Sequence, residues 1–400
     1  MDSQKLMEVN NKEKVSFIYN RNGNNYLKKI ILITLFILNL YIIFIILNLK
    51  NILKKINFEL TNDFLNNSKQ QKILKKITET SLNNLNTIKS YYKNQLEYKN
   101  DKYTNNNIDF YVKQQNDFCD FPSKYINFKY EELIKLTNFS FKGLCYQIYV
   151  YKKDDNYMSN GIIKTGKYEE IPMTNFLKAL KYYGKKKNIL NNKDIVMIDI
   201  GGNIGAHTSF LGKFGYSILT FEASPRNYYI LNKNYCHINR NSNIIIINKG
   251  LSDEERTCNY YSQINGIGNG ILFCNEKKNK IKISGYYFKK TFEVNLTKLS
   301  NFIPFLSNKN IALLKLDIEG GEGKAIESGI DLINKIHVPF IFSEFSPKML
   351  LSHGTDPKKF LQIFIDNGYK ISKKGFFSKK YINIDKIKHR CNLYFIYSKF

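Results

Sequence analysis

The chain has 400 residues, which is enough for two or three folded units of roughly 150 residues each. Hydrophobic residues make up 43% and the formal net charge is +27, so a substantial core is expected and wholesale disorder is excluded. The six cysteines form no C-x-x-C pair, which excludes zinc-ribbon and thioredoxin-like sites. Dispersed lysines carry the positive charge in a chain rich in Asn, Ile and Tyr, which indicates compositional bias rather than a tract that binds polyanions.

An uncharged apolar run from Ile30 to Leu49 follows a polar tail at residues 1–29 and predicts a transmembrane helix. At 1.5 Å per residue the run spans a hydrocarbon core of about 30 Å. Lysines flank both ends and balance each other, so the positive-inside rule leaves the orientation open. Because a short tail precedes a long folded part, we expect a type II anchor with most of the chain in the lumen of the endoplasmic reticulum or Golgi.

Two further features bear on the compartment. Three Asn-X-Ser/Thr triplets, which begin at Asn66, Asn138 and Asn295, would be glycosylation acceptors in a lumen, although an Asn-rich chain also contains such triplets by chance. The six cysteines are compatible with disulfides in an oxidising lumen and with thiols in the cytosol.

Residues 50–109 form an Asn/Lys-rich segment whose apolar residues recur at helical spacing. This pattern predicts a helical stem that can self-associate, with a loosely ordered linker as the alternative. Residues 110–190 predict an N-terminal subdomain that packs on the domain after it, with a strand at 146–151 and a helix at 173–183.

From residue 191 to the end, short apolar runs alternate with amphipathic stretches, which predicts an α/β fold with a parallel sheet. An excursion between Thr257 and Leu299 reads as a β-hairpin over one edge of that sheet. The predicted strands are 195–200, 217–221, 243–248, 311–316, 338–343 and 392–397. The predicted helices are 207–213, 225–235, 323–333 and 357–367.

The first predicted strand ends in Asp199 and runs into a glycine-rich turn, Gly201-Gly202-Asn203-Ile204-Gly205. Glycines let the backbone approach a ligand at the N-terminus of the next helix. Asn203 stands where the dinucleotide fingerprint G-x-G-x-x-G has its second glycine, and the carboxylate would repel pyrophosphate. A cationic ligand such as S-adenosylmethionine fits better, while a helix cap is the alternative role for Asp199.

Glu222 ends the second predicted strand, about two dozen residues after Asp199. In a doubly wound sheet this position lies beside the glycine turn at the carboxyl edge. A carboxylate there can accept two hydrogen bonds from a ribose diol, and the alternative is an ordinary surface acid.

A third motif, K-L-D-I-E-G-G-E at residues 315–322, closes another strand at the same edge. Asp317 is placed to act as a base or a metal ligand near a substrate hydroxyl. Glu319 and, at the end of the next strand, Glu344 are further candidates for catalysis. The alternative is that Glu319 and Glu322 only cap the helix that follows.

Together the segments VMIDIGGNIGAHTSF, LTFEASPRNYYILNKN, INKGLSDEE, LLKLDIEGGEGKAIESG and FIFSEFSP resemble the FkbM family of S-adenosylmethionine-dependent methyltransferases. The resemblance covers roughly residues 154–398 and implies a class I, Rossmann-like sheet of seven strands. It also implies O-methylation of a hydroxyl on a sugar or another small-molecule scaffold. By position, the cofactor would be bound by Asp199, the turn Gly201–Gly205 and Glu222. Asp253 would lie near the adenine.

Two other functions remain open on the sequence alone. A ribose 2′-O-methyltransferase acting on RNA would use a lysine and acids such as Lys315, Asp317 and Glu344, and the charge of +27 would suit RNA. A non-catalytic tethered relative is the other alternative. We expect a membrane-anchored O-methyltransferase that acts on a small-molecule or glycan acceptor. We expect that it uses no metal and does not bind nucleic acid.

Overall fold

The computed structural model describes residues 107–400. The predicted tail, the span at Ile30–Leu49, almost all of the stem and the Asn66 triplet lie outside the described residues. Within residues 107–400, no helix is both long and apolar enough to cross a membrane.

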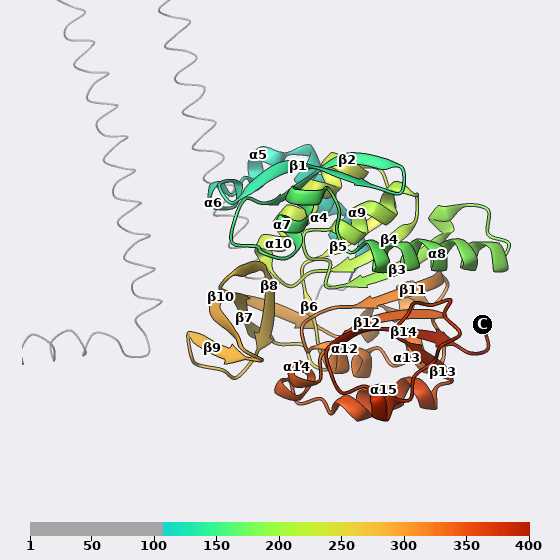
Figure 1. The fold of residues 1–400 in the computed structure, drawn as a ribbon. Coiled ribbons are helices and arrows are strands. Elements are labelled where there is room, and N and C mark those ends of the chain that lie inside the picture. Colours follow the sequence, from blue (N-terminus) through green and yellow to red (C-terminus); the bar gives the residue numbers. More distant parts are fainter. Residues whose placement is uncertain (1–106) are drawn as a thin grey trace, which may run out of the picture. The chain divides into compact units, whose positions relative to one another are not determined.

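A seven-stranded sheet with the order β13-β14-β12-β11-β3-β4-β5 forms the centre of this part of the chain (Figure 1). β14 pairs antiparallel with both β12 and β13, and the other pairs are parallel. The strand bounds are β3 Ile195–Ile200, β4 Ser217–Phe221, β5 Ile244–Ile247, β11 Asn310–Leu316, β12 Phe340–Phe345, β13 Tyr369–Ser372 and β14 Cys391–Tyr397. The prediction of an α/β fold with a mostly parallel sheet of seven strands is confirmed.

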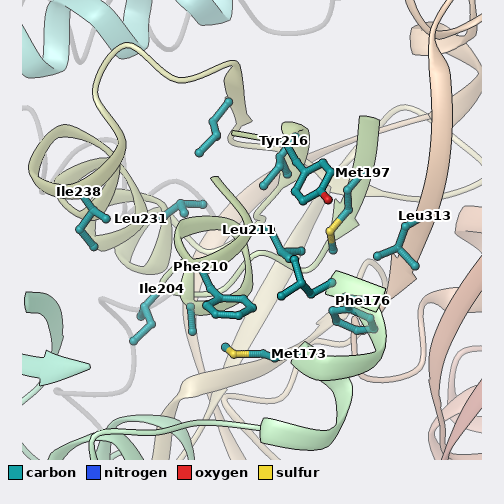
Figure 2. Close-up of a cluster of buried hydrophobic side chains, with 14 of the residues drawn as sticks. Met173, Phe176, Met197, Ile204, Phe210, Leu211, Tyr216, Leu231, Ile238 and Leu313 are labelled. Carbon is teal, nitrogen blue, oxygen red and sulfur yellow. The ribbon is translucent and has the colours of Figure 1, made fainter. Parts of the chain in front are cut away.

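Helices cover both faces of this sheet, because successive strand side chains point to opposite faces. Met197 and Leu313 face one apolar cluster, which also holds Phe176 and Phe210 from the helices (Figure 2). Their strand neighbours Ile198 and Leu314 face the opposite cluster. Helices on the first face are α8 Glu170–Lys186, α9 Ala206–Lys213 and α10 Pro225–Asn234; those on the second are α12 Glu322–Ser328, α13 Asp331–Asn334 and α15 Pro357–Asp366.

Two smaller sheets flank the central one. The predicted excursion is a five-stranded sheet in which β6, β10, β7 and β8 follow one another and β9 pairs with β10. The N-terminal part forms a hairpin of two strands. The remaining bounds are β1 Ile134–Phe141, β2 Leu144–Tyr151, β6 Gly250–Leu251, β7 Thr257–Gln263, β8 Gly266–Phe273, β9 Lys280–Ile283, β10 Tyr286–Thr297, α4 Ile108–Asp120, α5 Pro122–Tyr125, α6 Phe128–Glu131, α7 Met158–Thr165, α11 Ile303–Leu306 and α14 Pro347–Ser352.

Each predicted strand and helix has a counterpart in this structure, but three differences stand out. The predicted β-hairpin between Thr257 and Leu299 is instead most of a five-stranded sheet. The helix predicted at 323–333 is divided into α12 and α13 at Gly329. Gly329 donates its N–H to the Ala325 carbonyl, and a Cβ there would stand 2.5 Å from a methyl group of Leu299, so the chain turns where only glycine fits. β13 was not predicted, because its four residues follow α15 after a short turn and carry little periodicity.

The order of the strands reverses between β3 and β11, because β4 and β5 continue on one side and β12 on the other. In open α/β sheets ligands bind at such a switch point, outside the carboxyl ends of the strands. Asp199, Glu222, Asp317 and Glu344 all belong to strand ends at this edge.

Candidate functional site

A cavity of about 410 Å³ opens at the carboxyl ends of β3, β4, β11 and β12. This volume is within the range of about 300–1,000 Å³ that is usual for small-molecule sites. Its walls come from three regions: the sheet edge, the segment before α8, and the five-stranded excursion. The ionisable residues that line it are Glu169, His207, Glu222, Lys249, Lys315, Asp317, Glu319, Glu344 and Arg390.

The glycine turn forms the cavity floor because two neighbouring segments pass close to it. Gly201 has a φ of +90°, and a Cβ on it would lie 1.9 Å from the carbonyl oxygen of Asp317. At Gly202 a Cβ would lie 2.2 Å from the Thr220 hydroxyl. Any side chain at Gly201 would therefore push the end of β11 away from the end of β3, so glycine is needed to keep Asp317 beside the turn.

Glu222 lies at this floor, and each of its two carboxylate oxygens accepts one hydrogen bond from the backbone. Oε2 accepts a hydrogen bond from the Asn203 N–H at 2.7 Å, and Oε1 accepts one from the Ser224 N–H at 2.7 Å. Each oxygen keeps a second lone pair, so the carboxylate can also accept from a diol in the cavity. Burial raises the pKa of Glu222 to about 7, although the two backbone donors oppose this rise.

Asp199 lies behind the cavity wall rather than in it. It is fully buried, and its oxygens accept from Lys315 Nζ at 3.1 Å and from the Thr208 hydroxyl at 2.7 Å. Burial opposes ionisation, but the positive charge of Lys315 holds the pKa of Asp199 below its ordinary value. The Asp199 carboxylate is thus engaged within the protein and positions Lys315, and its predicted contact with the cofactor stays a prediction.

The three carboxylates predicted for catalysis, Asp317, Glu319 and Glu344, all line the cavity. Arg390, which the sequence did not single out, binds both glutamates: its guanidinium donates to Glu344 at 2.8 and 2.9 Å and to Glu319 at 3.3 Å. Burial, followed by the negative charges of Asp317 and Glu319, raises the pKa of Glu344. Asp317 lies outside this clamp, with Oδ2 at 3.6 Å from Lys315 Nζ.

Glu322 fixes the turn that carries Asp317 and Glu319. Its carboxylate accepts from the backbone N–H of Ile318 at 3.0 Å and of Gly320 at 2.9 Å. Glu319 between them has a φ of +52°, an unfavourable conformation for a residue with a side chain. The buried Glu322 carboxylate therefore holds a strained turn that directs the Glu319 side chain toward Arg390. The sequence suggested that Glu322 acts as an acid at the start of α12, and its carboxylate also holds this turn.

Sequence reasoning missed an acid that the N-terminal subdomain contributes. Glu169, directly before α8, lines the cavity and lies with Oε2 at 3.1 Å from His207 Nε2 on α9. Its φ of +41° is again left-handed, so the backbone is strained where the side chain enters the site. Although burial opposes it, His207 and Lys315 lower the pKa of Glu169. No motif marked Glu169, because its neighbours in the cavity are distant in sequence.

Two more predicted cofactor residues lie away from the cavity wall. Gly205 begins α9 with a φ of +87°, and a Cβ there would meet Leu231 at 2.3 Å, so this glycine serves helix packing. Asp253 accepts from the Ser252 hydroxyl and pairs with Lys324 at 3.5 Å and Arg256 at 3.9 Å. Gly201, Gly202, Asn203 and Glu222 line the cavity, whereas Gly205 and Asp253 do not, and the cofactor contacts of all six stay predictions.

The cavity has more acidic than basic side chains, the reverse of the chain as a whole. Five carboxylates line it, against the three cations Lys249, Lys315 and Arg390, while the whole chain has a net charge of +27. An excess of carboxylates favours a cationic ligand by Coulomb attraction. S-adenosylmethionine, with its sulfonium and amino groups, meets this condition. Glu222 is suited to its ribose, and the glycine turn leaves room for its close approach.

A seven-stranded sheet with one antiparallel strand, a glycine turn after its first strand and an acid after its second define a class I, S-adenosylmethionine-dependent methyltransferase. Residues 199–371 match the family described as methyltransferase FkbM domain. These residues carry an FkbM methyltransferase domain, and the cofactor is S-adenosylmethionine.

Solved structures and curated sequences add little to this assignment. A magnesium protoporphyrin IX methyltransferase from Synechocystis with bound S-adenosylmethionine is 10% identical, with 57% of this chain and 80% of that chain covered and a TM-score of 0.29. A precorrin-6y C5,15-methyltransferase from Geobacter metallireducens is 12% identical, with 55% and 87% covered and a TM-score of 0.26. Both TM-scores are too low to bear on function. Comparison with curated proteins finds no match.

Replacement of Glu222 by Ala should weaken S-adenosylmethionine binding by about 1–3 kcal/mol, because the ribose hydroxyls lose a charged acceptor. Isothermal titration calorimetry of the purified chain measures this loss. Asp331→Asn is the matched control, since Asp331 is an acid on α13 that pairs with Lys335 outside the cavity wall, and its affinity should equal that of the wild type. Equal affinities of Glu222→Ala and the wild type would contradict the assignment.

The affinity for S-adenosylmethionine should also depend on pH through Glu222. The pKa of this group is raised to about 7, so the carboxylate is protonated below that pH and accepts poorly from a diol. Affinity should therefore rise between pH 6 and pH 8 in the wild type. In Glu222→Gln that rise should shrink, and identical pH profiles for the two proteins would show that another group controls binding.

Proposed function

We propose that the protein is a membrane-anchored O-methyltransferase that methylates a hydroxyl group of a sugar, a glycan or another small molecule. The observation that carries this proposal is the position of Asp317 in the same cavity as Glu222 and the glycine turn. A cofactor held at the floor would thus face an acid that is free of the Arg390 clamp. When bound, S-adenosylmethionine supplies an electrophilic methyl group.

The residues around the cavity take distinct roles in this proposal. Asp317 accepts the proton of the acceptor hydroxyl, because it is the one of the three carboxylates predicted for catalysis that Arg390 does not bind. Lys315, with a pKa raised by Asp199 and Asp317 against the effect of burial, stays charged and holds Asp317 in place. Glu319 and Glu344 form the opposite wall with Arg390 and orient the acceptor.

Replacement of Asp317 by Asn should abolish methyl transfer and leave cofactor binding near the wild-type value, because the amide cannot take up a proton. The assay incubates the protein with S-adenosylmethionine labelled in the methyl group and with fractionated cell extract, and identifies the fraction that gains label. Asp331→Asn, an acid on α13 that pairs with Lys335 away from the cavity, serves as the control. Full transfer by Asp317→Asn would dismiss its role as the base.

We further propose a type II orientation with the catalytic domain in the lumen of the endoplasmic reticulum or Golgi. Two disulfides support it: Cys119–Cys236 joins α4 to the segment after α10, and Cys258–Cys274 joins β7 to β8. Disulfides form in oxidising compartments and are rare in the cytosol. The anchor at residues 30–49 that this orientation requires, and the stem that would allow self-association, remain predictions from the sequence.

The triplet that begins at Asn138 is better placed for glycosylation than the one that begins at Asn295. Asn138 and Ser140 are both exposed on β1, whereas Thr297 of the Asn295 triplet is fully buried in β10. In the lumen, treatment with an N-glycosidase should shift the gel mobility of the full chain, and Asn138→Gln should remove one glycan from the untreated protein. Asn295→Gln is the control and should change nothing. An unglycosylated domain that is open to protease on the cytosolic face would overturn the orientation.

A further inference from the structure

The excursion sheet contributes a wall of the cavity that the proposed mechanism does not use. The charged Lys249 lines the cavity directly before β6, but the lining residues of β7, β8 and β10 carry no charged side chain: they are Tyr260, Gln263, Gly268, Asn269, Gly270, Leu272, Tyr286 and Phe288. This neutral wall, together with Tyr157, contrasts with the carboxylates at the sheet edge. Because β7, β8 and β10 place neither Lys nor Arg in the cavity, their part of the wall offers no ion pair to an anionic group of a ligand.

Two tyrosines stand on this side with exposed rings. Tyr157, just before α7, is 45% exposed, and Tyr286, at the start of β10, is 39% exposed although both line the cavity. The Tyr157 ring lies against the backbone of Gly266, where a Cβ would come within 3.0 Å of it. Its hydroxyl accepts from Gln263 Nε2 at 3.2 Å, so the ring is fixed by packing on one side and a hydrogen bond on the other.

The register of the excursion places these groups on one surface. Gln263 on β7 lies opposite Phe288 on β10, and Phe288 shares a strand face with Tyr286 two residues earlier. Tyr287, between them, points to the other face: it is 56% exposed, does not line the cavity, and has Lys282 Nζ at 4.9 Å from its ring. The strand alternation therefore directs Tyr286, and not Tyr287, to the cavity face.

Amide groups complete the wall. Asn269 lines the cavity between two glycines of β8, and within the described residues its side chain forms no hydrogen bond. A Cβ on Gly268 would meet Asp155 at 3.2 Å and one on Gly270 would meet Tyr260 at 2.3 Å, so larger residues cannot replace these glycines without displacing the wall. An amide offers donors and an acceptor together, which suits the hydroxyl groups of a ligand.

We propose that Tyr157, Tyr286, Gln263 and Asn269 form the acceptor-binding subsite and that its ligand is a neutral saccharide ring. This inference rests on the proposed function and deepens it, because it assigns the acceptor class to a defined wall. A tyrosine ring presents a large apolar face at low entropic cost, and the C–H face of a sugar ring packs on it. The amides bind the hydroxyls at the ring's edge, which leaves one hydroxyl to reach Asp317.

The test uses the full chain and a panel of neutral methyl glycosides and oligosaccharides, with labelled S-adenosylmethionine as donor. We expect label on a saccharide. Tyr157→Ala and Tyr286→Ala should each raise the KM for that saccharide about tenfold, as the loss of one ring contact predicts. Their dissociation constants for S-adenosylmethionine should stay at the wild-type value, and Tyr287→Ala should match the wild type in both measurements.

Tyr157→Phe and Tyr286→Phe keep the ring and should retain a KM close to the wild-type value, which separates stacking from misfolding. Label that is lost on ribonuclease treatment, or label on a lipid or peptide, would overturn the saccharide subsite while leaving the methyltransferase function intact. The saccharide subsite would also be overturned, with the methyltransferase function intact, if the two alanine variants behave like Tyr287→Ala. A folded chain that fails to bind S-adenosylmethionine would instead refute the proposed function itself.

Discussion

The buried ammonium group of Lys315 holds together the two central strands at the edge where the cavity opens. Lys315 on β11 lies directly opposite Asp199 on β3, and its Nζ also donates to the Gly201 carbonyl at 2.9 Å. Their side chains are 2% and 0% exposed, so neither charge can be solvated if the other is removed. Loss of one partner from such a pair costs about 3–5 kcal/mol. The glycine turn and the start of the Asp317 loop both begin at these strand ends, so the cavity floor depends on this pair.

Several carboxylates lie around this pair, and Arg390 neutralises part of their negative charge. Arg390 balances one of the two glutamates that it binds, so Glu319 and Glu344 together keep one excess charge beside Asp317. Burial and this crowding favour the retention of a proton in the cluster, since both glutamates have a raised pKa. A cation entering the cavity would relieve the repulsion. The same groups whose mutual repulsion is costly therefore favour a sulfonium ligand.

Much of this arrangement could be predicted from local sequence. Gly201, Glu222 and Asp317 stand at strand ends, and parallel strands bring their carboxyl ends to one edge whatever the rest of the fold. The sequence could not separate acids that face the cavity from acids that face the core: Asp199 is engaged by Lys315, which lies 116 residues away. Glu169 and Arg390 were missed for the same reason, because each acts through partners on distant elements and its own neighbours show no pattern.

The RNA alternative from the sequence is less compatible with these contacts. That function needs a lysine near the ribose hydroxyl, and Lys315 does approach Asp317, at 3.6 Å. However, its Nζ is already engaged by Asp199 and the Gly201 carbonyl, and burial keeps it away from a polyanion. A nucleic-acid backbone also needs cations along its path, whereas the excursion side of the cavity presents aromatic rings and amides. Of the three cations in the cavity, Lys315 and Arg390 are already paired with carboxylates, and this favours a neutral, hydroxyl-bearing acceptor over a phosphate-bearing one.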